Sequence, residues 1–227
     1  MQRICKKTAS WEIYSNLKAR PPLVVRADGR GFGKILEGCK KPYDIDFARS
    51  MVEAAVSLFQ DSGLSPALAF AFSDEISLLF LDAPFDGRVE KVDSVVASIL
   101  SGALSLALGR AVSMDCRLIP VCRSEIIEYL CQRQDETWRN HVFSYGFYAL
   151  IEDGLTNVQA MEHLRGMREH EIHELVFKKG INLAKTPAWE RRGVLVYRRD
   201  GDVVEDWELS LLKDEDGHRL IEGILTE

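Results

Sequence analysis

The chain has 227 residues, 46% of them hydrophobic, and a net charge of −6. This length and apolar content are enough to bury a large core, so they exclude disorder as the main state. The acidic balance excludes a basic coat over the whole surface for gripping nucleic acid. Residues 200–217 hold eight acidic residues and one lysine. The rest of the chain is therefore slightly positive, and this charge is compatible with binding of a polyanionic partner.

No apolar run reaches the roughly 20 residues that span a bilayer, and the first residues lack the apolar stretch of a signal peptide. We therefore expect a soluble, cytoplasmic protein without a membrane partner. The five cysteines include no C-x-x-C pair, so the sequence favours neither a disulfide framework nor a structural zinc site. We expect reduced thiols at Cys5, Cys39, Cys116, Cys122 and Cys131.

The first half of the chain predicts the element order β-α-β-β-α-β. Short apolar runs between turn residues indicate strands, and apolar residues at helical spacing indicate helices. The predicted elements are a strand at 23–27 that ends at Asp28, a helix at 45–61, a hairpin of strands at 67–72 and 76–81, a helix at 88–108 and a strand at 114–121. This order is typical of the ferredoxin-like, or split βαβ, fold of the α+β class.

That topology has a consequence for two distant acidic residues. In the split βαβ fold the strands lie in the order four, one, three, two, so the end of strand one lies beside the turn between strands two and three. Asp28 ends the first predicted strand, and Asp74 lies in that turn. We therefore expect these two carboxylates to meet at one edge of the sheet.

The second half of the chain predicts added helices followed by short strands. The helices are expected at 123–152, 156–165 and 169–179, and the strands at 193–198, 203–212 and 220–225. We expect residues 1–122 to form the catalytic domain. Residues 123–227 form an extension packed on it, so that the whole is one compact unit.

A glycine-rich run follows the first strand: Asp28, Gly29, Arg30, Gly31, Phe32 and Gly33. Glycines in this place let backbone N–H groups approach phosphate oxygens, and the neighbouring carboxylate can hold magnesium. A plain glycine-rich turn explains the same residues equally well. The G-x-G-x-G spacing is not a dinucleotide fingerprint, and no helix is expected to start there.

The predicted hairpin turn carries Ser73, Asp74 and Glu75. Adjacent acids at a turn are usually solvated, but their meeting with Asp28 favours a metal site. Facing carboxylates repel unless a cation lies between them, and a pair of divalent ions stabilises the attacking and leaving oxygens of phosphoryl transfer.

Two sets of polar residues complete the candidates. Lys41, Arg88 and Lys91 would neutralise a triphosphate, although solvated surface charge is their ordinary role. Arg133, Gln134, Arg139 and Asn140 give a predicted helix a polar face that could meet a sugar-phosphate backbone. Packing alone explains the repeat of that helix.

Taken together, these motifs resemble the histidine-tRNA guanylyltransferase family, which adds nucleotides in the 3′-to-5′ direction to a tRNA 5′ end. The resemblance runs from about Leu23 to Arg198. Its parts are V-R-x-D-G-R-x-F at 25–32, K-P-x-D at 41–44, S-D-E at 73–75, F-x-x-R-x-x-K at 85–91, D-x-R at 115–117, Arg133-Gln134 with Asn140, and the 189–193 stretch.

The resemblance implies a fold related to the polymerase palm and the nucleotide cyclases, and a homotetramer built as a dimer of dimers. It implies that Asp28 and Asp74, with the Gly29 carbonyl, bind two Mg²⁺ ions that Glu75 supports. Lys41, Ser73, Arg88 and Lys91 would contact triphosphate, and Asp44 would lie near the base of the activating nucleotide. In the implied reaction, ATP or GTP activates a 5′-phosphorylated tRNA, the 3′-hydroxyl of an incoming NTP attacks the activated phosphate, and pyrophosphate is removed.

The sequence departs from the eukaryotic pattern in two places. Gly33 stands where that pattern has histidine, and residues 138–144 read W-R-N-H-V-F-S in place of H-I-N-N-L-Y-N, with only Asn140 kept. These departures resemble the archaeal and bacterial branch and favour template-dependent repair of tRNA 5′ ends. The alternatives are addition of G at position −1 of histidine tRNA, a palm-type nucleotide cyclase, and an RNA-binding module without catalysis.

Overall fold

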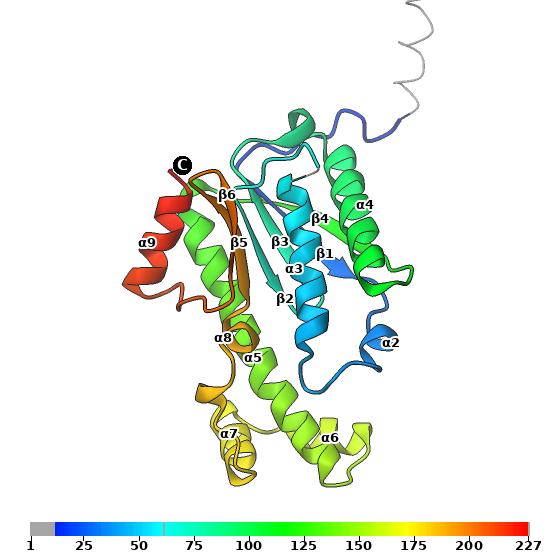
Figure 1. Ribbon diagram of the computed structural model, residues 1–227, viewed down its shortest axis with the longest axis vertical. Coiled ribbons are helices and arrows are strands. Elements are labelled where there is room, and N and C mark those ends of the chain that lie inside the picture. The colour runs from blue at the N-terminus through cyan, green and yellow to red at the C-terminus, as the bar shows by residue number, and fades with distance from the viewer. Residues whose placement is uncertain (1–11, 61, 227) are drawn as a thin grey trace, which may run out of the picture.

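A six-stranded antiparallel sheet forms the centre of the molecule (Figure 1). The computed structural model describes residues 12–60 and 62–226. The strands are β1 (Leu23–Gly29), β2 (Leu68–Phe72), β3 (Glu75–Phe80), β4 (Met114–Pro120), β5 (Val194–Arg199) and β6 (Asp202–Asp206). Their order across the sheet is β4-β1-β3-β2-β5-β6. The predicted order of the first four strands is confirmed, and β5 and β6 extend the sheet beyond β2.

Helices cover both faces of this sheet. Helices α3 (Ile45–Gln60) and α4 (Val89–Leu108) cover one face, and α5 (Ile126–Glu152) and α9 (Glu215–Ile224) cover the other. The described residues also form the helices α2 (Gly33–Leu36), α6 (Asn157–Leu164), α7 (Glu169–Lys178) and α8 (Ala188–Arg192). Side chains alternate along β1, so that Val25 packs toward α3 and α4 while Val24 packs toward α5 and α9. The sheet therefore has two buried faces, which explains why its strands read as nearly continuous apolar runs.

The distal half of α5 extends beyond the sheet and carries α6 and α7 (Figure 1). A separate apolar cluster, which includes Val142, Leu164 and Val176, holds these three helices together. Thr156 caps α6, because its hydroxyl accepts a hydrogen bond from the Gln159 N–H at 3.3 Å. The proximal half of α5 packs on the sheet, so this single helix joins both parts.

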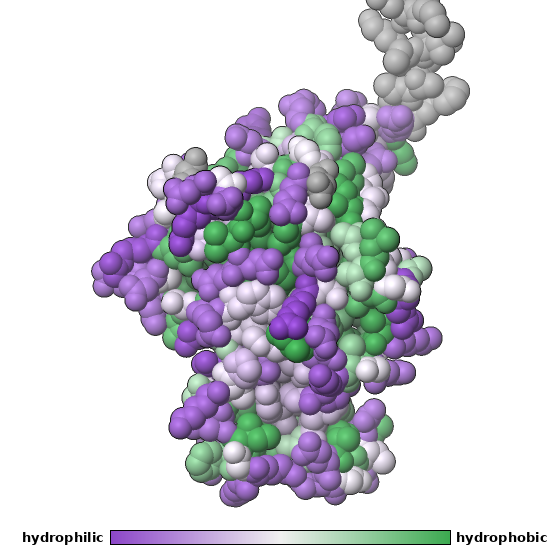
Figure 2. Space-filling view, in the orientation of Figure 1, coloured by the Kyte–Doolittle hydropathy of each residue, from purple (hydrophilic) through white to green (hydrophobic). Residues whose placement is uncertain are grey.

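Helix α4 is long and apolar enough to span a membrane by length and composition alone. Its Val92, Val96, Leu100 and Leu104 are fully buried against α3 and the sheet. Other apolar side chains of this helix face outward: Leu106 is 86% exposed, and Figure 2 shows hydrophobic side chains gathered along α4. The buried side chains form one stripe along α4, which packs this helix on the core.

The structure corrects three local expectations. Residues 220–224 belong to helix α9 and not to a strand, because Ile221 and Ile224 are buried on one side of a helix that follows Asp214. The strand expected at 203–212 is β6, which ends at Asp206. A short helix, α2, starts at Gly33, where none was expected.

Four cysteines, Cys39, Cys116, Cys122 and Cys131, are free thiols, as expected. Cys5 lies outside the described residues.

Candidate active site

The site is built at the edge of the sheet where β1 ends. A two-residue turn, Ser73 and Asp74, joins β2 to β3, and β1 pairs with β3 so that Asp28 lies opposite Glu75. The Gly29 N–H donates a hydrogen bond of 2.9 Å to the Asp74 carbonyl. This bond holds the hairpin turn against the end of β1. Asp28, Asp74 and Glu75 are therefore brought together, as the topology predicted.

Local backbone requirements explain two residues at this edge. Ser73 has φ of 53°, the left-handed conformation that a two-residue hairpin turn demands. A Cβ atom on Gly29 would lie 2.4 Å from the ring of Phe32, so only glycine fits there. Phe32 itself is 2% exposed and packs edge-on against Phe47 at 6.0 Å.

Burial and charge work against the ionised form of these acids. Burial raises the pKa of Asp74, and the nearby negative charge of Asp28 raises it further. Burial also raises the pKa of Glu75, although the charges of Arg133 and Arg26 oppose that shift. The edge is thus a place where positive charge is needed to keep carboxylates ionised.

Three guanidinium groups supply part of that charge. Arg133 on α5 contacts Glu75 at 3.2 Å, and Arg117 on β4 contacts Asp28 at 2.8 Å. Arg26 lies between the two acids, 3.7 Å from Asp28 and 3.6 Å from Glu75. The sequence pattern did not indicate a role for Arg26 or Arg117. A signal was present, because Arg26 is two residues from Asp28 on one strand and therefore shares its face.

The residues at this edge fit a divalent cation completed by substrate oxygens. Within residues 12–60 and 62–226, no three His, Cys, Asp or Glu side chains form a ligand set of their own. Yet Oδ2 of Asp28 is buried without a hydrogen-bond partner there, since Arg117 approaches it outside hydrogen-bond geometry. Two carboxylates leave most positions of an oxygen-ligated Mg²⁺ for phosphate and water, which is the usual arrangement for nucleotide-bound magnesium.

Two adjoining spaces open from this edge. A cleft of about 120 Å³ is lined by Asp28, Asp74, Glu75, Arg133 and other residues of the hairpin and α5. A larger cavity of about 280 Å³ lies between α3, the 39–44 loop, α5 and α8. Phe72, Ser73 and Asn140 line both spaces. A ligand in the larger cavity would therefore reach the acidic edge past Ser73.

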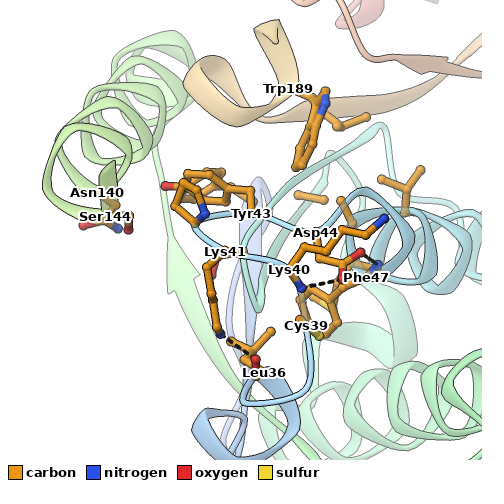
Figure 3. A pocket seen from close by; sticks show the side chains of 18 of the residues that line it. Leu36, Cys39, Lys40, Lys41, Tyr43, Asp44, Phe47, Asn140, Ser144 and Trp189 are labelled. Atoms are coloured by element: carbon orange, nitrogen blue, oxygen red, sulfur yellow. Dashed lines mark hydrogen bonds between the residues drawn. The ribbon is translucent and has the colours of Figure 1, made fainter. Parts of the chain in front are cut away.

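The larger cavity has aromatic and apolar walls with a few polar groups (Figure 3). Trp189, Tyr148 and Phe47 form part of its wall, and Asn140 and Ser144 add polar atoms from α5. An apolar slot with a small number of polar groups is typical of small-molecule sites. Its volume is close to the lower limit of roughly 300 Å³ that such sites show.

Besides Ser73, two predicted nucleotide contacts line this cavity, Lys41 and Asp44. The Lys41 ammonium donates to the Leu36 carbonyl and lies 5.6 Å from the centre of the Tyr148 ring. Asp44 accepts hydrogen bonds from the N–H groups of Lys40 at 2.8 Å and Asp46 at 2.9 Å. These bonds, above all that from Lys40, hold the pKa of Asp44 below its usual value. Asp44 is thus an ionised cap at the start of α3 that faces the cavity.

The glycine-rich run divides into exposed and buried residues. Arg30, Gly31 and Gly33 are exposed beyond the end of β1. The Phe32 ring belongs to the core, so a nucleotide contact by this residue would come from its backbone, and that contact stays a prediction.

Arg88 and Lys91 lie away from the acidic edge. The backbone of Arg88 forms a β-bridge with Lys18, which precedes β1. Leu23, the first residue of β1, lies opposite Phe80 at the far end of β3. Asp28 ends the same strand at its other end. A single chain therefore does not bring these two cations to the acids, contrary to the expectation that they contact the same triphosphate.

The four predicted tRNA contacts on α5 have different surroundings. Gln134 is 4% exposed and hydrogen-bonded to backbone groups, so its assignment to tRNA is wrong. Arg133 faces Glu75 and Glu136 with a side chain only 14% exposed, so it serves the acidic edge and not an open surface. Asn140 lines the cavity. Arg139 is exposed, and its contact with tRNA stays a prediction.

A buried polar layer behind the cavity escaped the sequence analysis. His141 is completely buried, stacks on Tyr43 at 5.6 Å, and lies 3.0 Å from the Thr186 hydroxyl through Nε2. Tyr145 donates a 2.7 Å hydrogen bond to Glu190, which is 8% exposed. Burial lowers the pKa of His141 to about 4 and raises the pKa of Glu190. This layer supports the wall that Tyr43 and Trp189 present to the cavity.

Comparison with known proteins places this geometry in a family. Residues 5–130 match the family model of tRNAHis guanylyltransferase, and residues 124–219 match the model of the Thg1 C-terminal domain. A probable tRNA(His) guanylyltransferase of Drosophila melanogaster is 31% identical over 192 residues, covering 78% of this chain and 67% of that protein. The tRNA(His) guanylyltransferase of Schizosaccharomyces pombe is 28% identical over 212 residues, covering 87% and 80%.

Solved structures share the fold. A bacterial tRNA(His) guanylyltransferase (Thg1)-like protein in complex with ATP superposes with a TM-score of 0.83 at 22% identity, covering 99% of this chain and 100% of that one. The tRNA(His) guanylyltransferase of Saccharomyces cerevisiae superposes with a TM-score of 0.75 at 24% identity, covering 87% and 93%. The expected α+β palm-like fold is confirmed by these likenesses.

Proposed function

Because the chain belongs to the tRNAHis guanylyltransferase family of nucleotidyltransferases, we propose that it adds nucleotides in the 3′-to-5′ direction to the 5′ end of tRNA, with base pairing choosing the nucleotide. The observation that carries this proposal is the continuity of the cavity with the acidic edge. A base in the cavity places its phosphates past Ser73, where Asp28 and Asp74 lie.

Each part of the site has a task in this reaction. Two bound Mg²⁺ ions would stabilise the charge on the attacking and leaving oxygens of nucleotidyl transfer. Asp28 and Asp74 are the residues that would hold them. The aromatic walls would stack on the base of the activating nucleotide, ATP or GTP, and the bacterial Thg1-like protein of the same fold binds ATP. The Lys41 ammonium, which donates to the Leu36 carbonyl, would instead donate to a phosphate oxygen when nucleotide is bound.

Glu75 has a different task from that of the two aspartates. Arg133 and Arg26 surround its carboxylate, so its charge is already matched by protein groups. We assign Glu75 to holding these two guanidiniums in place beside the metal ligands. This arrangement keeps the hairpin and α5 in register at the site.

The surroundings of residues 138–144 support template-chosen addition. Trp138 donates a hydrogen bond of 2.8 Å to Glu169 on α7, and His141 is buried behind the cavity. Asn140, Phe143 and Ser144 reach the cavity from this segment. Trp138, His141 and Val142 thus serve packing inside the protein. We assign base selection to a template strand, while the protein binds the backbone.

A second candidate is the addition of one G at position −1 of histidine tRNA. The Drosophila and S. pombe relatives, which cover most of this chain, carry that name. The acidic edge and the cavity serve this reaction equally well. The two candidates differ only in whether base pairing selects the nucleotide.

Comparing two tRNA substrates separates these candidates. One is a tRNA that lacks its first nucleotide and retains the pairing base opposite, and the other is an intact histidine tRNA with A73. We expect a higher kcat/KM on the truncated tRNA, with a nucleotide added only when it pairs. Preference for the intact histidine tRNA would establish the second candidate. By family membership we also infer a homotetramer, which light scattering would reveal as four times the mass of one chain.

A further inference from the structure

Arg117 touches both Asp28 and a second carboxylate, Asp115, at the same edge of the sheet. We propose that Arg117 is a positioning residue that neutralises Asp28 while no metal is bound, and moves onto Asp115 when a divalent cation takes its place. This inference rests on the proposed function, because it takes Asp28 as a metal ligand.

The register of β1 and β4 sets up this arrangement. Asp28 pairs with Asp115 and Arg26 pairs with Arg117, so Arg117 is the diagonal neighbour of Asp28. One guanidinium nitrogen, Nη2, lies 2.8 Å from Asp28 and 3.2 Å from Asp115. Only the contact with Asp115 has hydrogen-bond geometry. Transfer of Arg117 between these carboxylates therefore needs a side-chain rotation and no backbone movement.

Exposure explains why Arg117 moves and its neighbours do not. The side chains of Arg133 and Arg26 are 14% and 23% exposed and are enclosed by the acidic edge and α5. That of Arg117 is 51% exposed, and that of Asp115 is 57% exposed. A cation on Asp28 would lie at contact distance from the Arg117 guanidinium, and this repulsion is relieved when Arg117 turns to Asp115.

The ion pair between Arg117 and Asp28 competes with the cation for the Asp28 carboxylate. A cation binds only the fraction of molecules in which Asp28 is free, so the ion pair raises the apparent Kd in proportion. Exposed ion pairs of ~0.4–1 kcal/mol correspond to a change of about twofold to fivefold in Kd. Asp115 lowers the apparent Kd because it offers Arg117 another partner.

Binding of Mn²⁺ alone to the full chain, followed by electron paramagnetic resonance of the free ion, tests this inference. Arg117→Gln should lower the Kd about twofold to fivefold, and Asp115→Asn should raise it. The double variant should match Arg117→Gln alone, because Asp115 acts only through Arg117. If Asp115→Asn weakens binding equally in both backgrounds, the carboxylate acts by general electrostatics and the inference is overturned.

Two controls make the result specific. Arg110→Gln removes an exposed guanidinium in the loop before β4, a residue for which the described part of the chain shows no ion pair, and it should leave the Kd unchanged. An equal effect of Arg110→Gln and Arg117→Gln would overturn the inference. Asp28→Asn should abolish binding; if it does not, the proposed metal site fails, and the inference fails with it. Loss of the Arg117 effect alone, with Asp28 still required, overturns only the inference.

Discussion

At the scale of single residues, Asp28 and Asp74 lie at an open edge of the sheet, where a carboxylate can be changed without disturbing the core. We expect Asp28→Asn and Asp74→Asn each to lower nucleotide addition a thousandfold or more. Loss of several kcal/mol of transition-state stabilisation has this effect at about 1.4 kcal/mol per tenfold. Single-turnover assays with 5′-labelled tRNA would measure it.

A matched control for these variants is Asp46→Asn. Asp46 is exposed in the first turn of α3, and within the described part of the chain its carboxylate forms an ion pair with Arg49 alone, three residues along the same helix. It should retain nearly full activity. Activity of either site variant within tenfold of the unmodified chain would remove that aspartate from the chemistry.

His141 makes the stability of the molecule depend on pH. Its pKa is about 4 in the folded state because of burial, with smaller contributions from Arg191 and His173. The unfolded chain has the ordinary value of about 6.5, so it binds more protons than the folded chain between these values. Stability that is present above pH 6.5 is therefore lost as the pH falls toward 4. The loss from this residue is about 2 kcal/mol between pH 7 and pH 4.5.

Urea unfolding at pH 7, 6 and 4.5 would measure this dependence. His141→Leu should unfold with a shallower pH dependence than the unmodified chain over that range, whatever its stability at pH 7. His163→Leu changes an exposed histidine on α6 and should keep the full dependence. Identical pH profiles for His141→Leu and the unmodified chain would contradict the assignment.

At the scale of elements, Gln134 ties α5 to the C-terminal segment. Its side-chain nitrogen donates to the Ser210 and Arg192 carbonyls at 3.1 and 3.3 Å, and its oxygen accepts from the Leu212 N–H at 2.8 Å. The chain between β6 and α9 is held on α5 by these bonds. Leu209 and Leu212 are completely buried beside them.

We expect Gln134→Met to destabilise the fold by about 2–3 kcal/mol, because the substitution keeps the volume but leaves buried backbone groups without partners. Urea unfolding followed by circular dichroism would measure the change. Gln132→Met, on the exposed side of the same helix, should cost less than about 0.5 kcal/mol. Equal stability of the two variants would show that the buried amide contributes nothing.

At the scale of the whole molecule, the two halves of the chain share one sheet and one core. β5 pairs with β2 from Leu68 to Ala71, and among the described residues only those after 122 cover the α5 and α9 side of the sheet. The fragment 1–122 would expose Val24, Leu79 and other apolar side chains of that face. The expected 1–122 domain thus depends on the extension to bury one face of its sheet.

We expect the isolated 1–122 fragment to show no cooperative thermal transition by circular dichroism. Co-expression with 123–227 should restore a folded complex, because the missing strands and helices then return to the sheet. A soluble monomeric fragment with a sharp transition would show that the first half folds by itself.

The sequence by itself determined the order of the first four strands, the helices around them and the meeting of Asp28 with Asp74. These features follow from local periodicity and from a topology that allows one strand order, so no long-range detail was needed. The family resemblance also rested on short motifs and is confirmed. The strand wrongly expected at 220–225 shows the limit of this reasoning, since a short apolar run fits a strand or a helix equally well.

Only the tertiary structure decided which polar residues face the site. Gln134 and Asn140 are six residues apart on one helix, yet one is buried against backbone groups and the other lines the cavity. Arg88 and Arg117 are both exposed cations, but strand register places only Arg117 beside Asp28. The physical reason is that a side chain's role depends on which distant segments pack against it, and local sequence carries little information about that packing.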